Sequence, residues 1–187
     1  MGRGWVSVLV GLTRVLAGCS GSTSDQPKVL PPVVTPSASP SVSSTVSAGP
    51  VVVPSAAVPF TPQGAAAFVR FFYGELNAAF QDGHDERIRV FSDRACTTCA
   101  NYANAVAAGA SAGSRIVGTT FAGLQVEASP PRAGVATVTV IGIIPMRGLE
   151  EKGKSSTLAA DGRFVHTLAL QRHGDHWLVL AIRSEKS

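Results

Sequence analysis

The feature that most limits folding is a block rich in proline and serine. The 41 residues of positions 20–60 include eight prolines and ten serines, and no aromatic residue precedes Phe60 in this block. Proline removes backbone hydrogen-bond donors, and serine buries too little apolar surface to offset the entropy lost on ordering. We therefore expect a disordered linker over residues 19–60 and a single domain over residues 61–187.

The first 18 residues have the pattern of a lipoprotein signal peptide. Arg3 supplies a positive charge, residues 5–12 are apolar, and Leu-Ala-Gly directly precedes Cys19. Small residues before the cleaved bond suit a signal peptidase, and the apolar run is shorter than the about 20 residues that span a bilayer. We expect export, cleavage before Cys19 and lipidation of that cysteine, which would anchor the protein to the outer face of the cell membrane.

The charge of the chain argues against nucleic acid as a partner. The formal net charge is +4, with 16 Lys and Arg against 12 Asp and Glu. Two of the arginines, Arg3 and Arg14, lie in the expected signal peptide, which leaves 14 basic residues and a net charge of +2. A phosphate-binding surface needs a concentrated basic face, which this composition does not supply.

The first half of the domain has helical periodicity. Thr61 and Pro62 form a typical helix start, and the helix is expected to end near Gly83. Its apolar residues recur at spacings of three and four: Ala65, Phe68, Phe72, Leu76 and Ala79. Two shorter helices are expected over 85–91 and from the cysteines at 96 and 99 to about residue 110.

The second half has the period of β-strands. Four strands are expected, at 116–127, 133–144, 162–173 and 176–184, with a bulge near Gly118 or Gly123 in the first. Gly174 and Asp175 predict a tight hairpin, and residues 145–161 a long polar loop. Helices followed by antiparallel strands predict an α+β fold, with the N-terminal helices packed on a curved four-stranded sheet.

Two of the expected strands are apolar on both faces. In 176–184, Trp177 and Val179 alternate with Leu178, Leu180 and Ile182, and strand 133–144 has the same character. Three helices can cover one side of a sheet, so we expect a protein partner, a homodimer or a small apolar ligand on the other side. The alternative is that these are simply central, strongly twisted strands.

Three segments carry a resemblance to a known family. They are FVRFFY at 68–73, Cys-x-x-Cys at 96–99 and GDHWLV at 174–179. With the lipobox and linker, they resemble an uncharacterised family of actinobacterial lipoproteins. Its domain is similar to the cone-like fold of nuclear transport factor 2 and the polyketide cyclases. The resemblance implies that fold over about residues 62–184, with a pocket between helices and sheet, and implies no activity.

The pair Cys96 and Cys99 has three interpretations. Two cysteines remain once Cys19 carries lipid, and in an oxidising compartment a disulfide at a helix N-terminus is favoured. A zinc site would need His173 and His176 as further ligands. A thiol–disulfide activity is typical of a βαβ context, which this sequence lacks.

A candidate pocket consists of His166, Arg183 and Trp177. His166 lies on the same strand face as Phe164 and Leu168, and regular hairpin pairing would place it opposite Arg183. In a cavity it could act as a general base, and otherwise it is a hydrogen-bonded core histidine. Trp177 would pair with Arg172, which favours a cation–π contact.

No sequence motif identifies a catalytic group, a cofactor or a metal site. No Ser-His-Asp set or phosphate-binding glycine loop is apparent. The sequence therefore favours a membrane-tethered, non-catalytic binding domain. The alternatives are an envelope enzyme that uses His166 and a thiol–disulfide protein that uses Cys96 and Cys99.

Overall fold

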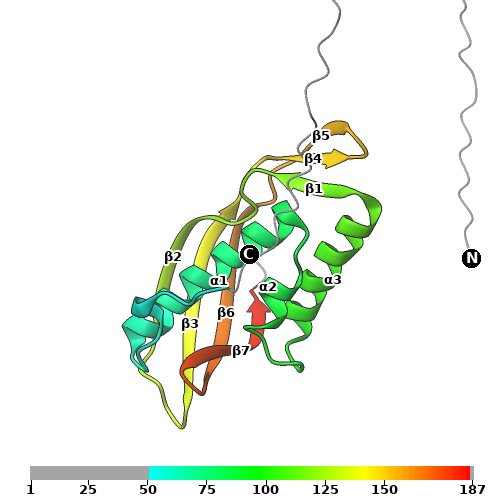
Figure 1. The fold of residues 1–187 in the computed structure, drawn as a ribbon. Helices are drawn as coiled ribbons and strands as arrows, with labels where there is room; N and C mark the ends of the chain where they lie inside the picture. The colour runs from blue at the N-terminus through cyan, green and yellow to red at the C-terminus, as the bar shows by residue number, and fades with distance from the viewer. Residues whose placement is uncertain (1–50, 186–187) are drawn as a thin grey trace, which may run out of the picture. The chain divides into compact units, whose positions relative to one another are not determined.

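The computed structural model describes residues 51–185, which form an α+β domain (Figure 1). The expected signal peptide, Cys19 and the linker up to residue 50 lie outside the described residues. The elements in chain order are η1 (Ser55–Ala57), α1 (Pro62–Asp82), α2 (Glu86–Arg89), α3 (Thr97–Ala112), β1 (Ser114–Val117), β2 (Ala122–Ala128), β3 (Val135–Ile144), β4 (Arg147–Glu151), β5 (Lys154–Leu158), β6 (Gly162–His173) and β7 (His176–Ser184). Within the described range, no helix combines the length and apolar character needed to cross a membrane.

Helix α1 follows the expected capping pattern closely. The Thr61 hydroxyl accepts a hydrogen bond from the Gly64 amide, and Pro62 occupies the first turn. Gly83 ends the helix in the left-handed conformation, with φ of 82°. All five residues of the predicted apolar stripe are buried, so α1 is the central helix of the core.

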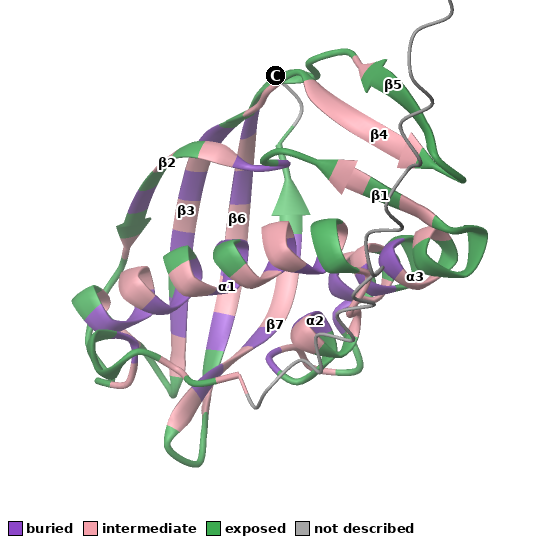
Figure 2. Ribbon diagram, turned by 45° about the horizontal axis from the view of Figure 1, so that its top comes forward, coloured by how far each residue is buried: buried purple, intermediate pink, exposed green. Residues whose placement is uncertain are grey.

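The main sheet has the order β2-β3-β6-β7, and all of its pairs are antiparallel. Helix α1 lies across one face of this sheet, which we call the inner face (Figure 2). Its central residues are fully buried: Ala136, Val138, Val140, Leu168, Leu170, Trp177 and Val179. The expected α+β fold, with helices on a four-stranded antiparallel sheet, is confirmed.

A second sheet, β1-β4-β5, contradicts the predicted loop at 145–161. Strands β4 and β5 pair across a two-residue turn at Lys152 and Gly153, whose φ values of 49° and 77° suit a tight hairpin. The predicted strand 116–127 is also divided, between β1 and β2. The hairpin was not predicted because its strands are mainly polar and none of their residues is buried, so no apolar alternation marks them. Since β3 leads into β4 and β5 into β6, the chain leaves the main sheet through this hairpin and then returns to it.

A bulge in β7 overturns the predicted faces of that strand. Ala169 pairs with Ala181 but Leu170 with Val179, so Leu180 is an extra residue. Regular alternation would have turned Arg183 toward the core. With the bulge, Ile182 is 5% exposed on the inner face and Arg183 is exposed on the opposite face.

Residues 51–60 differ from the linker expected up to residue 60. Ala57 is fully buried, and Val51 and Val53 pack against the core. The ring of Phe60 stacks on Trp177, with centroids 4.7 Å apart. These apolar side chains offset the ordering cost that proline and serine alone could not, so residues 51–60 belong to the packed domain.

Candidate functional site

The most polar part of the core is a contact between helix α1 and strand β6. The Tyr73 hydroxyl lies 2.6 Å from Nδ1 of His166, and the histidine is only 5% exposed. Phe164 and Phe121 surround the imidazole, with ring centroids 4.6 and 6.4 Å away. The strand pattern predicted that His166 faces the core, but nothing in the sequence predicted its hydrogen bond with Tyr73 on α1.

Burial determines the protonation of this pair. It lowers the pKa of His166 and raises the pKa of Tyr73 well above its ordinary value. The phenol therefore keeps its proton and donates a hydrogen bond to Nδ1, so that the neutral imidazole carries its own proton on Nε2. His166 is therefore buried and hydrogen-bonded, as expected for a core histidine rather than for a general base in a cavity.

The predicted pocket of His166, Arg183 and Trp177 is not assembled. The bulge places Ser184 opposite His166 and Thr167 opposite Arg183, which faces away from the core. Trp177 pairs with Arg172 as expected, but six residues along β6, roughly 20 Å, separate that pair from His166. The stacking partner of Trp177 is Phe60, while the Arg172 guanidinium donates to the carbonyls of Gly174 and Val58.

The disulfide between Cys96 and Cys99 is confirmed, with Cα atoms 5.3 Å apart. Cys96 is the N-cap of α3, and its sulfur accepts a hydrogen bond from the Cys99 amide. An open groove of about 650 Å³ runs past Cys99, lined by residues of α2 and the following loop. Both cysteines are nevertheless only 1% exposed, so an incoming thiolate has no direct path to either sulfur.

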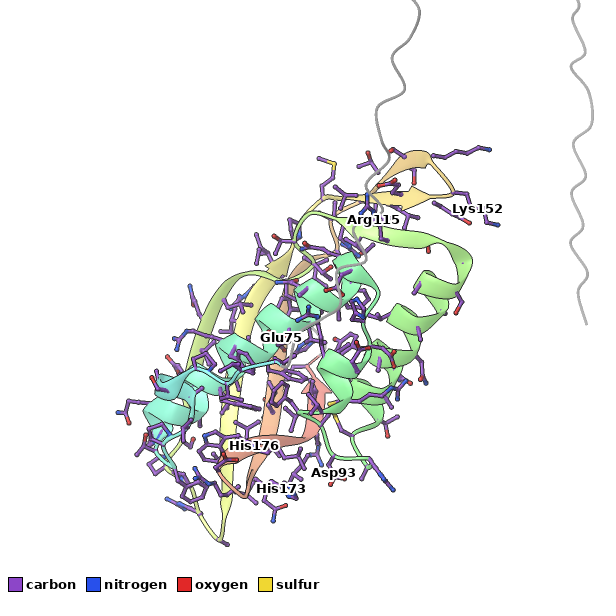
Figure 3. The ribbon with its side chains drawn as sticks, viewed as in Figure 1. Glu75, Asp93, Arg115, Lys152, His173 and His176 are labelled. Atoms are coloured by element: carbon purple, nitrogen blue, oxygen red, sulfur yellow. A yellow bond between two sulfur atoms is a disulfide. The ribbon has the colours of Figure 1, made fainter. Side chains whose placement is uncertain are left out.

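The four residues of the hypothetical zinc site, Cys96, Cys99, His173 and His176, do not form a metal site in the structure. The two sulfur atoms are bonded to each other, so neither is a thiolate ligand. His173 and His176 pair across the β6–β7 turn at one end of the domain (Figure 3). Over residues 51–185, no three His, Cys, Asp or Glu side chains form a group that could hold a metal ion.

A small apolar slot lies where α1 and α3 meet β1. It has a volume of about 170 Å³, and Phe80, Val106, Ile116 and Leu149 form part of its wall. Arg115 stands at its edge, where its guanidinium donates to the Glu150 carboxylate at 2.7 Å. Neither this slot nor the groove beside the disulfide is lined by His166.

Within residues 51–185, α1 packs on the inner side of the main sheet, and we call the opposite side the outer face. Figure 2 shows buried and more accessible residues alternating along β3 and β6, with α1 on one side. Facing away from α1 are Val135, Thr137, Thr139, Ile141, Ile143, Arg163, Val165, Thr167, Ala169, Gln171, Leu178, Ala181, Arg183, Gln125 and Glu127. Within the described part of the chain, each of these residues is at least partly accessible to solvent.

The outer face is apolar in the middle and charged at its edges. Ile141, Val165, Ala169 and Ala181 are all half-buried, each paired with a residue of a neighbouring strand. Exposed charges surround this middle: Glu127 on β2, Arg163 near the start of β6, and Arg183 on β7. Just beyond β7, the Glu185 carboxylate accepts a hydrogen bond from the Thr167 hydroxyl. The apolar second face predicted from the sequence is therefore present, although the bulge changed which β7 residues belong to it.

Comparison with known proteins gives fold likeness only. No family model and no curated protein matches this chain. Among solved structures, the intermembrane space region of chloroplast protein ARC6 is similar over 65% of this chain and 97% of its own, with a TM-score of 0.46 and 12% identity. A putative calcium/calmodulin-dependent protein kinase II association domain from Xanthomonas campestris matches over 67% and 86%, with a TM-score of 0.39 and 11% identity. A variant of Rd1NTF2_05 matches over 63% and 96%, with a TM-score of 0.33 and 13% identity. At these values the likenesses carry no argument about function.

Proposed function

We propose that this protein is a membrane-tethered, extracytoplasmic interaction domain without catalytic activity, and that it binds a protein through the outer face of its sheet. Acyl chains on Cys19 would hold it at the membrane, and the proline-rich linker would carry the domain away from the surface. The observation that carries the proposal is the uncovered apolar middle of the outer face. A sheet with both faces apolar gains stability when the second face is also removed from water.

The interior supports binding rather than catalysis. A general base must reach its substrate, and His166 is enclosed by Tyr73, Phe164 and Phe121. The disulfide is buried beneath its groove, which disfavours thiol exchange. The outer face instead presents partly accessible apolar side chains on neighbouring strands of the main sheet, which suits a protein partner better than a small ligand.

Photo-crosslinking from two matched positions tests the interaction surface. A benzophenone amino acid would replace Val165 on the outer face or Val90, which is 54% exposed on the helical side. In intact cells we expect a discrete protein adduct from position 165 and none from position 90. Equal labelling at both positions, or none at position 165, would refute an interaction through the outer face.

The tether is tested separately. Labelled palmitate should enter the wild-type protein, and Cys19→Ser should abolish the label and release the domain from the membrane fraction. Persistence of an unlabelled, uncleaved chain in the cytosol would contradict the membrane part of the proposal. The photo-crosslinking result does not depend on this outcome.

A further inference from the structure

We propose that the free edge of β5 is a second interaction site, which binds an extended acidic segment of a partner protein as an added antiparallel strand. The second sheet has the order β1-β4-β5, so β5 is one of its two edge strands. Residues 154–157 of β5 are all exposed. This site lies on a different sheet from the outer face, so the inference goes beyond the proposed function and does not depend on it.

The register of the β4–β5 hairpin determines which backbone groups are free. Glu151 and Lys154 close a two-residue turn and form a hydrogen-bonded pair, and such pairs recur at every second position along the two strands. Ser155 and Thr157 lie between these positions, so the N–H and C=O groups of both residues point away from β4. Among residues 51–185, neither residue makes another backbone hydrogen bond. The edge therefore presents donors and acceptors at the spacing that an added strand requires.

The other three sheet edges of the domain are occupied. On β2, the Arg70 guanidinium donates to the Val126 carbonyl. On β7, the Val179 amide donates to the Phe91 carbonyl, and the Val179 carbonyl accepts from the Asp93 amide. Strand β1 is in contact with α1 and α3. Because proteins usually cover or block their sheet edges, the open edge of β5 is the exception in this domain.

The charges at the turn end of β5 favour an acidic partner. Lys152 and Lys154 are exposed and have no ion-pair partner among residues 51–185. Glu151, opposite Lys154, is also unpaired there, and the other two charged residues of the hairpin form ion pairs with residues outside it. Two lysines against one glutamate leave a positive charge that selects an acidic strand over other strands. In an antiparallel arrangement the C-terminal end of the partner strand lies beside these lysines.

The edge of β5 is also open to approach. Residues 155–157 have small hydroxyl side chains, and the pairing of β5 with β4 contains no bulge. Figure 3 shows Lys152 and His176 at opposite ends of the domain. Val51, the first described residue, lines a groove together with His176. The linker therefore joins the domain at the end away from the β4–β5 hairpin, which leaves this edge accessible to a protein in the membrane-tethered arrangement proposed above.

Amide exchange in the presence of a synthetic strand tests the site. The probe is a peptide in which threonine and valine alternate and whose C-terminal end carries two aspartates, added to the purified full-length protein in detergent. In the free protein the Ser155 and Thr157 amides should exchange at least about tenfold faster than the Ser156 amide, which is paired with β4. The peptide should slow exchange of the Ser155 and Thr157 amides by about tenfold and leave Ser156 nearly unchanged.

Proline substitution separates the role of the backbone from that of the side chain. Thr157→Pro removes an N–H that points away from β4 and places the proline ring on the open side, so binding of the peptide should weaken by about tenfold or more. Thr157→Ala keeps the amide and should bind the peptide as the wild type does. Slow exchange of the Ser156 amide in the proline variant verifies that the hairpin is intact.

A charge swap tests the acidic character of the partner. Lys152→Glu combined with Lys154→Glu should weaken binding of the aspartate peptide several-fold and strengthen binding of the same peptide with lysines in place of the aspartates. If the variant binds both peptides as the wild type does, selection of an acidic segment is wrong.

Two further outcomes would overturn the site. One is equal binding of the peptide to the Thr157→Pro variant and the wild type, or no protection of the Ser155 and Thr157 amides. The other is protection that appears without peptide and rises with protein concentration, because the occupant would then be a second copy of the chain. The adduct expected at position 165 is unaffected by any of these results, so interaction through the outer face is tested separately.

Discussion

The hydroxyl of Tyr73 and Nδ1 of His166 lie 2.6 Å apart although 93 positions separate them in the chain. This contact joins α1 to the centre of the main sheet at the most polar point of the core. Because the phenol is the donor and the imidazole the acceptor, each satisfies a group that would otherwise be buried without a partner. The pair therefore stabilises the packing of α1 on β6.

Removing the phenol oxygen should be costly. Tyr73→Phe leaves Nδ1 of His166 without a donor inside the core, and the free energy of unfolding should fall by about 1–3 kcal/mol. Denaturant titration measures this loss. Tyr102→Phe is the matched control, because no hydrogen bond of the Tyr102 hydroxyl is present among residues 51–185; a loss as large there would argue against a special role for the pair.

The stability of the domain should decrease in acid because of His166. Burial lowers the pKa of His166 in the folded state, so below its ordinary pKa of 6.5 the unfolded chain binds a proton that the folded chain does not. As the pH falls below 6.5, the free energy of unfolding should decrease by up to about 1.4 kcal/mol per pH unit, until the pH reaches the folded-state pKa of His166. Above pH 6.5 this contribution should be constant.

Chemical unfolding at several pH values checks this dependence. His166→Gln should have a flatter profile than wild type below the ordinary histidine pKa. His173→Gln removes a histidine from the exposed hairpin turn and should keep the wild-type profile. Identical profiles for wild type and His166→Gln would show that another group causes the acid sensitivity.

The disulfide should be structural and resistant to reduction. A loop of four residues closed by Cys96 and Cys99 contributes about 2 kcal/mol in the entropy model, so Cys96→Ala with Cys99→Ala should lower stability by that amount. Because both sulfurs are buried, mild reductant should open the bond only as the domain unfolds. Thiol titration of the native protein provides the measurement, and rapid release of two thiols would revive the thiol–disulfide alternative.

The segment before α1 should contribute to stability. Phe60→Ala removes the ring stacked on Trp177 and should cost about 1–2 kcal/mol, since Phe60 is itself 41% exposed. Val52→Ala, at a site 78% exposed, should change stability very little. Thermal unfolding compares the two variants, and equal effects would mean that residues 51–60 do not dock in solution.

Residues close together in the chain were predictable from the sequence. The start and end of α1 depend on Thr61 and Gly83, whose capping contacts reach only three or four residues along the chain. The hairpin at Gly174 and the bridge between Cys96 and Cys99 are equally local. The apolar outer face was also visible, because alternation along a strand reports burial on both sides.

Only the tertiary structure decided the features that depend on distant partners. The bulge at Leu180 forms because the core accepts Ile182 and excludes Arg183, a choice that regular alternation does not reveal. The β4–β5 hairpin and the docking of Phe60 on Trp177 likewise depend on surfaces that exist only after folding. Local capping and turn energies can be read from neighbouring residues, whereas register and buried polar pairs result from competition among contacts across the whole domain.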